Sequence, residues 1–171
     1  MLIPGTRAPE LELPLTIQAR FSLADQTPDN FTMLVFYRGS HCPVCRNQLE
    51  TIGGRLEEVT KRGVSPFAIS MDSEDRAMKV DREWDTHDLP LAYGLTEEQA
   101  RQWGLYISER REGSDEPDRF SEPGLFLLRP DRTVYFASTQ SAPFTRPPLD
   151  ELLQGIDFVL KNDYPARGGA T

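Results

Sequence analysis

The chain has 171 residues, of which 38% are hydrophobic and 27% are charged, and its net charge is −8. An acidic surface without a dense cluster of Lys or Arg repels phosphate groups, which argues against nucleic acid or an anionic membrane as a partner. No apolar run approaches the roughly 20 residues that cross a bilayer, and the N-terminus lacks the pattern of a secretory signal, so we expect a cytoplasmic protein.

The first half of the chain predicts an edge hairpin, a buried strand, a helix and a second strand. Apolar and polar residues alternate over residues 9–23, which is the pattern of a strand or hairpin. Residues 33–37 form a short, wholly apolar run, as in a strand buried on both faces. A helix is expected from Pro43 to Arg62, followed by a strand from Val64 to Ser70. Gly53-Gly54 lies inside this helix and favours a bend or close packing.

The middle of the chain predicts two helices and a loop. Apolar residues recur at helical spacing from Ser73 to Asp85. Thr96 with Gln99 three positions later resembles a capping box, which would open a short helix that stops at Gly104. Residues 108–120 are charged and poor in apolar side chains, so we expect a loop there.

The last third predicts two strands and an amphipathic helix. The strands are expected at residues 125–128 and 133–137, and the helix over residues 149–160. Together the elements predict an α/β domain, in which a mixed central β-sheet carries helices on both faces. A single domain is predicted over residues 1–164, with a frayed tail at 165–171.

Both cysteines of the chain lie in one stretch, YRGSHCPVCRNQ, between the buried strand and the following helix. Cys45 begins a series of apolar residues spaced by four and three, which places it on the core face of the helix and predicts that it is buried. The other members of this series are Leu49, Ile52, Leu56 and Val59. Cys42 stands at the very start of the helix, where we expect its sulfur to face solvent.

The position of Cys42 predicts a reactive thiol. Unpaired N–H groups and the helix dipole lower the pKa of a thiol at a helix N-terminus. Pro43 suits the first helical turn, where its missing N–H costs nothing. His41, if protonated, would lower the pKa of Cys42 further, and Arg46 lies one turn away. A C-x-x-C after a strand and opening a helix is the redox arrangement, with Cys42 as the nucleophile and Cys45 as the resolving thiol.

Two alternative roles of the cysteine pair remain open at this point. A lone C-x-x-C can be half of a zinc site, but a structural site needs four ligands. His41 and His87 are the only histidines in the chain, so a closed site would need carboxylates or a second chain. The two cysteines could also be incidental core residues.

The chain resembles the alkyl hydroperoxide reductase/thiol-specific antioxidant (peroxiredoxin-like) branch of the thioredoxin superfamily along nearly its whole length. The similar segments are PGTRAPELEL with FSL, MLVFYRGSHCPVC, FAISMDSED, LPLAYGL with ARQWGLY, and EPGLFLLRPDRTVYF. Their order and spacing carry the resemblance. It implies a thioredoxin-like fold with an N-terminal β-hairpin extension.

The sequence departs from that branch at the positions that reduce peroxide. Peroxiredoxins carry Pro and Thr seven and three positions before the reactive Cys, where this chain has Val35 and Gly39. Pro123 stands where they carry an Arg. Pro123 instead resembles the cis-proline that faces the disulfide in thioredoxins, so we expect a cis bond there. The buried carboxylate that thioredoxins carry six residues before the first Cys is Phe36 here.

The leading hypothesis is a thiol-disulfide oxidoreductase in antioxidant and redox homeostasis, which uses the C-x-x-C couple without a cofactor or metal. Supporting roles are expected for His41, Pro43, Pro123 and Arg46. The expected partners are an external thioredoxin- or glutathione-type reductant and a disulfide-containing protein or hydroperoxide substrate. One alternative is a thiol-dependent hydroperoxide reductase with Cys42 peroxidatic and Cys45 resolving. The other is a non-enzymatic redox-sensing or partner-binding domain.

The remaining polar and aromatic residues are expected to have ordinary structural roles. His87 is expected in a solvated loop. Trp84 and Trp103 are expected in or just beneath the core, because they stand in phase with apolar neighbours. Asp72 and Asp75 are expected at a solvated helix start. The charged segment 108–120 precedes Pro123, so we expect it to border the substrate side of a thioredoxin-type fold.

Overall fold

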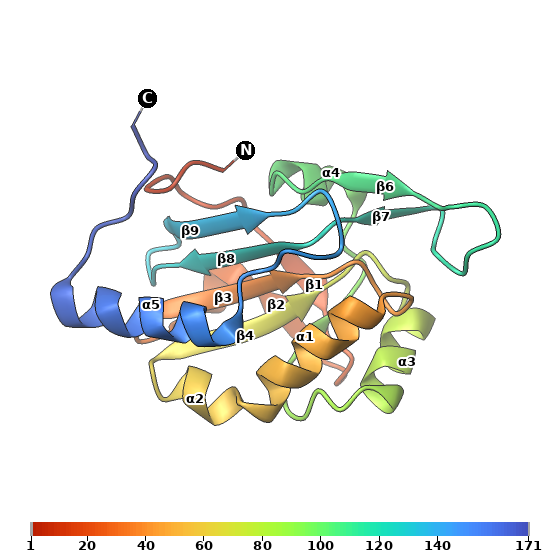
Figure 1. Ribbon diagram of the computed structural model, residues 1–171, viewed down its shortest axis with the longest axis horizontal. Coiled ribbons are helices and arrows are strands. Elements are labelled where there is room, and N and C mark those ends of the chain that lie inside the picture. The colour runs from red at the N-terminus through yellow and green to blue at the C-terminus, as the bar shows by residue number, and fades with distance from the viewer. Residues whose placement is uncertain (1, 171) are drawn as a thin grey trace.

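The computed structural model describes residues 2–170, so Met1 and the last residue of the predicted tail, Thr171, lie outside it. A five-stranded sheet runs through the molecule in the order β5-β4-β3-β8-β9 (Figure 1). Its strands are β3 (Phe31–Phe36), β4 (Val64–Ile69), β5 (Leu91–Ala92), β8 (Gly124–Leu128) and β9 (Val134–Thr139).

The central strand is β3, and all of its residues are buried. It pairs parallel with β4 and antiparallel with β8, so the sheet is mixed. The predicted α/β fold with a mixed central sheet is therefore confirmed. The sequence did not predict β5, because a strand of two residues is too short to show an alternation.

Helices cover both faces of the sheet, as predicted. They are α1 (Pro43–Gly54), α2 (Leu56–Thr60), α3 (Glu74–Glu83), α4 (Glu97–Gln102) and α5 (Leu149–Asn162). On one face, Leu49 of α1, Val80 of α3 and Ile156 of α5 share a core with the sheet. On the other face, Ala100 of α4 packs with Trp103. Within residues 2–170, no helix is long and apolar enough to cross a membrane.

The helix predicted from Pro43 to Arg62 is in fact two helices, α1 and α2. The break falls at Arg55, whose φ of −122° and ψ of 26° are not helical. A Cβ at Gly53 would lie 2.2 Å from the carbonyl oxygen of Thr86, so only glycine permits this close approach. The expected bend and close packing at Gly53-Gly54 are both present, while the expected single long helix is wrong.

The predicted N-terminal hairpin is formed by β1 (Glu12–Pro14) and β2 (Arg20–Ser22), which pair antiparallel and lead into a 3₁₀ turn at Leu23–Asp25. The capping box of α4 is also confirmed. The N–H of Gln99 donates to Thr96 Oγ1 at 3.1 Å, and the N–H of Thr96 donates to Gln99 Oε1 at 2.9 Å.

The tryptophans and His87 lie where the sequence placed them. Trp84 and Trp103 are buried. His87 is exposed, and its Nε2 lies 3.5 Å from Asp85 Oδ1.

Residues 108–120 are not a plain loop. β6 (Ile107–Glu109) and β7 (Arg119–Ser121) pair antiparallel, and a charged turn joins them in a hairpin that projects from one end of the molecule (Figure 1). Arg119 forms ion pairs with Glu97 and Glu109. Charged side chains of this hairpin are thus held in ion pairs, which a hydropathy pattern cannot reveal.

The segment after α5 runs back toward the start of the chain. A Cβ at Gly169 would lie 2.6 Å from the carbonyl oxygen of Pro4. The two ends of the chain lie on the same side of the molecule (Figure 1). The tail predicted to fray therefore lies beside the N-terminal segment up to residue 170.

Candidate active site

The loop between β3 and α1 carries Cys42 to the start of the helix, and Asp72 fixes this loop. Gly39 has a φ of +131°, and a Cβ there would lie 2.6 Å from Asp72 Oδ1, so the loop requires glycine. The N–H of Ser40 donates to Asp72 Oδ2 at 2.7 Å, and Arg76 Nε donates to Asp72 Oδ1 at 3.3 Å. Asp72 is buried, so its expected place at a solvated helix start is wrong. Its carboxylate instead holds the loop that delivers Cys42.

Cys42 is the N-cap of α1, and Pro43 is the first helical residue, as expected. The N–H of Cys45 donates to Cys42 Sγ at 3.2 Å. The sulfur thus satisfies one of the N–H groups that a helix start leaves unpaired, which favours its thiolate form. Both cysteines are free thiols.

Both sulfurs are buried, and this corrects one expectation. Cys45 is 0% exposed, as predicted, but Cys42 is only 1% exposed, although we expected it to face solvent. The N-cap geometry accounts for the difference, because it turns the Cys42 side chain back toward the helix and Cys45. Exposure therefore does not distinguish the two thiols.

Acidity does distinguish them. The pKa of Cys42 is lowered to about 6, chiefly because its thiolate accepts a hydrogen bond from the Cys45 thiol; burial opposes this shift, while the Cys45 N–H and the Arg146 guanidinium add to it. Burial raises the pKa of Cys45 well above its ordinary value. Cys42 is therefore the thiol of the pair that ionises first.

Arg146 is a functional residue that no sequence pattern revealed. Its Nη2 donates to Cys45 Sγ at 3.0 Å and lies 3.8 Å from Cys42 Sγ. Its Nη1 donates to Gln48 Oε1 at 2.5 Å and its Nε to the carbonyl of Pro143 at 2.7 Å. Within residues 2–170, no carboxylate pairs with Arg146. The thiolate of the cysteine pair is therefore its counter-charge.

Little in the sequence identifies Arg146. It lies about 100 positions after the cysteines, in the segment between β9 and α5, and belongs to no motif. The one local signal is a single basic residue in an apolar stretch, SAPFTRPPL. Thr145 before it has a φ of +63°, an uncommon conformation for a residue other than glycine, which is often found at functional sites.

Arg38 lies on the side of the cysteine pair opposite Arg146, and two carboxylates balance its charge. Its guanidinium lies 3.5 Å from Glu116 Oε1 and 3.0 Å from Glu122 Oε2, and both carboxylates are buried. The same guanidinium stacks over Phe120 at 4.7 Å. The β6–β7 hairpin thus contacts the loop before Cys42, and its expected place beside the substrate stays a prediction.

His41 lies next to Cys42 but does not act as a cation. Burial and the nearby guanidinium of Arg38 lower its pKa to about 4, so it is neutral at pH 7. Its ring packs against Phe120, with the centroids 4.8 Å apart, and neither ring nitrogen has a hydrogen-bond partner among the described residues. The expected help of a protonated His41 is therefore wrong.

Two further predicted residues take different places from those expected. Arg46 Nε donates to Glu50 at 2.8 Å and its Nη2 to the carbonyl of Glu83 at 3.1 Å, so its charge is paired away from the sulfurs. The bond before Pro123 is trans, because residues 2–170 contain no cis peptide bond. The expected cis-proline is wrong.

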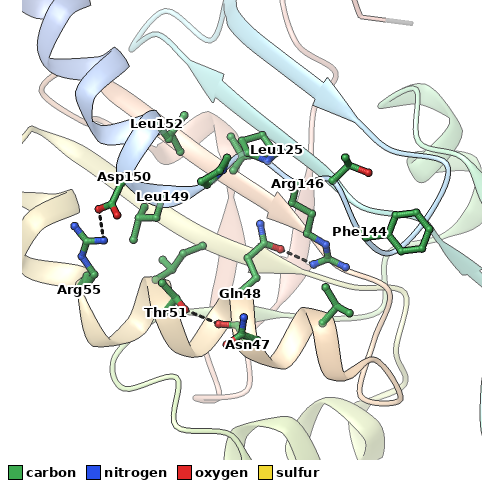
Figure 2. A pocket seen from close by; sticks show the side chains of 15 residues that line it. Asn47, Gln48, Thr51, Arg55, Leu125, Phe144, Arg146, Leu149, Asp150 and Leu152 are labelled. Atoms are coloured by element: carbon green, nitrogen blue, oxygen red, sulfur yellow. Dashed lines mark hydrogen bonds and ion pairs between the residues drawn. The ribbon is translucent and has the colours of Figure 1, made fainter.

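A groove of about 420 Å³ lies beside the cysteine pair, between α1 and the segment that enters α5 (Figure 2). Arg146 and Gln48 form the wall nearest the sulfurs. The ion pair between Arg55 and Asp150, 2.6 Å long, closes the far end. The rest of the lining is mainly apolar, and its apolar members are Val44, Ile52, Leu125, Phe144, Pro147, Pro148, Leu149 and Leu152.

No group of three or more His, Cys, Asp or Glu side chains in the described part of the chain could hold a metal ion. The two cysteines contact each other and Arg146.

Solved structures of three peroxiredoxin-type proteins have a similar fold. Peroxidoxin BcpB from Mycobacterium tuberculosis has a TM-score of 0.72 and 19% identity, over 93% of this chain and 99% of that one. Mycobacterium bovis AhpC has a TM-score of 0.76 and 16% identity, over 100% and 99%. Yeast mitochondrial 1-Cys peroxiredoxin has a TM-score of 0.74 and 17% identity, over 95% and 78%. The comparison with curated proteins finds no match.

The fold and the site together define a thiol redox protein: a thioredoxin-like sheet, with an acidic cysteine at the start of the helix that follows its central strand. The sequence matches the AhpC/TSA family over residues 4–137, and the chain belongs to that family. The predicted peroxiredoxin-like relation is thereby confirmed. Membership supports a thiol-dependent oxidoreductase with antioxidant activity, which is the enzyme class expected from the sequence.

Proposed function

We propose that this protein is a dithiol–disulfide oxidoreductase, in which Cys42 is the nucleophile and Cys45 the resolving thiol. The observation that carries the proposal is the shared arginine: one guanidinium contacts both sulfurs, so it can stabilise a negative charge on either. A site with one working thiol would need the arginine at that sulfur alone.

The reaction would run in two exchange steps. The Cys42 thiolate attacks one sulfur of the substrate disulfide, and the other sulfur leaves as a thiolate and takes a proton. Cys45 then loses its proton and attacks Cys42, which forms the Cys42–Cys45 disulfide and releases the second substrate thiol. The dithiol supplies both electrons. Arg146 lies nearest Cys45, where it would lower the cost of forming the second thiolate.

A second thiol system must return the Cys42–Cys45 disulfide to the dithiol. We infer a thioredoxin- or glutathione-type reductant. The yeast mitochondrial 1-Cys peroxiredoxin of similar fold is described as being resolved through glutathione/thioredoxin systems, which supports this class of partner. The net charge of −8 makes the tripeptide glutathione, itself an anion, the less favoured of the two.

Peroxide reduction is the second candidate, and the family relation favours it. Cys42 would attack the peroxide, become a sulfenic acid, and condense with Cys45 to the same disulfide with loss of water. Against this, Val35, Gly39 and Pro123 stand where peroxiredoxins carry the groups that orient a peroxide. Arg146, on the other side of the site, would have to orient the peroxide alone.

One experiment separates the two candidates. The reduced protein is mixed with hydrogen peroxide and, separately, with a protein disulfide, and each second-order rate constant is divided by that of a free thiol at the same pH. We expect a large acceleration with the disulfide only. Cys42→Ser should abolish it, and Cys45→Ser should trap the mixed disulfide. A greater acceleration with peroxide would reverse the order of the two candidates.

A further inference from the structure

We propose that the groove between α1 and the start of α5 binds the apolar, uncharged group that is attached to the reacting sulfur of a small disulfide. This inference names the substrate class of the proposed exchange reaction and rests on it. The groove's volume of about 420 Å³ is in the range of small-ligand pockets, roughly 300–1,000 Å³.

The groove lies next to the sulfurs of the cysteine pair. Arg146 lines it, and the Nη2 atom of the same guanidinium is 3.0 Å from Cys45 Sγ. Gln48, which also lines the groove, holds Nη1. Only the guanidinium of Arg146 therefore separates the groove from a group attached to the sulfur that Cys42 attacks. Cys42 itself is buried, so the substrate must displace Arg146 or approach along it.

The charges of the groove favour an uncharged occupant. Arg55 is paired with Asp150 and with Glu58, and its pair with Asp150 lies at the far end of the groove (Figure 2). Nη2, Nη1 and Nε of Arg146 each already have a partner in the reduced protein. No lining cation in the described part of the chain is therefore free to receive a carboxylate, and a charged group would lose its hydration without compensation.

The lip of the groove favours an apolar occupant. Phe144 is 64% exposed and Val44 is 40% exposed, and the two line the same opening. Large apolar side chains that are exposed next to a concave apolar surface commonly mark a binding site. Along the α1 wall, Val44, Gln48 and Thr51 stand at helical spacing, so this helix presents a continuous wall that begins two residues after Cys42.

The reaction balances as an ordinary exchange. For a disulfide R–S–S–R, Cys42 forms a sulfur–sulfur bond to one RS group, and the other leaves as RS⁻ and is protonated. In the mixed disulfide, R occupies the groove. Cys45 then attacks Cys42 and releases the second RSH. One disulfide is reduced to two thiols while the protein dithiol is oxidised.

The test uses two neutral alkyl disulfides of similar intrinsic reactivity, those of benzyl mercaptan and 2-mercaptoethanol, together with glutathione disulfide. Each rate constant is divided by that for a free thiol. We expect the benzyl compound to be favoured about tenfold over the hydroxyethyl compound, since burial of an extra apolar group discriminates by at least this factor. Glutathione disulfide should be the slowest of the three.

A matched pair of variants locates the preference. Thr51→Trp places a large ring in the groove, and Thr60→Trp makes the same change on α2, outside it. Both threonines are exposed, and each hydroxyl donates to a carbonyl of its own helix. Thr51→Trp should lower the benzyl rate and so remove the benzyl preference, while Thr60→Trp, outside the groove, should leave the rates of both neutral disulfides within about twofold. Benzyl alcohol should inhibit the wild-type reaction with the benzyl disulfide.

The outcomes separate the two proposals. If all three disulfides are accelerated alike and Thr51→Trp affects none selectively, the groove is not the subsite, while the exchange function stands. If none of the three reacts faster than with a free thiol while a protein disulfide still does, the inference fails and the exchange function stands; if the protein disulfide is not accelerated either, the proposed function itself fails. A preference for glutathione disulfide would also overturn the inference, because binding the carboxylates of glutathione disulfide requires cationic side chains that are not already paired.

Discussion

Two arginines flank the cysteine pair, and they differ in their counter-charges. Arg38 lies between the buried carboxylates of Glu116 and Glu122. Arg146 has no carboxylate partner in the described chain and directs Nη2 at the sulfurs. Arg38 is the smallest of the influences that lower the pKa of Cys42. The comparison teaches that nearness to a thiol does not decide an arginine's role. What decides it is whether carboxylates or the thiolate balance the charge of the arginine.

The largest effect should follow from removal of Arg146, the arginine whose counter-charge is the thiolate. Arg146→Met should raise the pKa of Cys42 from about 6 by roughly one unit. The shift is limited because the hydrogen bonds from Cys45 remain. Thiolate forms as the pH rises through the pKa, so the pH midpoint of alkylation should move upward and the rate at pH 6 should fall. Iodoacetamide kinetics from about pH 4 to 9 measure it.

Arg46→Met is the matched control for this measurement. Arg46 lies in the first turn of α1 but is bonded to Glu50 and Glu83. The change should leave the midpoint within about 0.3 unit. An equal shift in both variants would mean that net charge, not the contact of Arg146, sets the acidity of Cys42.

A smaller effect should follow from a change of the partner that orients Arg146. In Gln48→Glu, a carboxylate replaces the amide that accepts from Nη1, so it competes with the thiolate for the guanidinium. The pKa of Cys42 should rise by about half a unit. Asn47→Asp adds the same charge one residue away, without a contact to Arg146, and should shift the pKa less. Alkylation kinetics again provide the readout. Equal pKa shifts in Gln48→Glu and Asn47→Asp would show that Gln48 does not orient Arg146.

On the Arg38 side, the effect should fall on stability and not on acidity. Glu116→Gln leaves Arg38 and Arg111 with a weaker acceptor in a buried position and should cost about 1–3 kcal/mol of unfolding free energy. The pKa of Cys42 should change by less than about 0.3 unit. Denaturant unfolding measures the first quantity. Glu112→Gln, an exposed residue of the same turn, should change neither.

The pH dependence of this stability has a definite sign. The hydrogen bond from Arg111 lowers the pKa of Glu116 from 4.5 to about 2 in the folded protein. A carboxyl with a lowered pKa stabilises the fold above its unfolded pKa, and this contribution disappears as the pH falls through the folded one. The difference between wild type and Glu116→Gln should therefore shrink between pH 4.5 and 2. If the difference in unfolding free energy stays constant with pH, the cost of Glu116→Gln does not come from the ion pairs of Glu116.

The sequence predicted the elements whose signal is local. The apolar run of β3, the spacing of Cys45 and Leu49, and the capping box at Thr96 each depend on neighbours in the chain, and each is present. The sequence failed where a distant group decides the outcome. Gly53 packs on Thr86, and Asp72 is buried because Ser40 and Arg76 bond to it.

The site shows the same division. The reactive pair and its helix were visible, because their spacing and position are properties of one short stretch. The arginine was not: Arg46 is near in sequence and Arg146 is near in space. No pattern in a single sequence encodes a contact across about 100 residues. The charge of His41 was misjudged for a related reason, since burial against Phe120 is a tertiary effect.

The smallest effect is expected for His41, and it tests whether any other cation supports the thiolate. Because the pKa of His41 is about 4, the imidazole carries no charge over the range in which Cys42 titrates. His41→Ala should therefore leave the alkylation midpoint of Cys42 within about 0.3 unit. Loss of the contact with Phe120 should still cost about 0.5–1.5 kcal/mol of stability, so a change in unfolding free energy shows that the ring was packed. A midpoint that rises by a unit, as expected for Arg146→Met, would mean that His41 is protonated beside the thiolate and acts together with Arg146 on the acidity of the site.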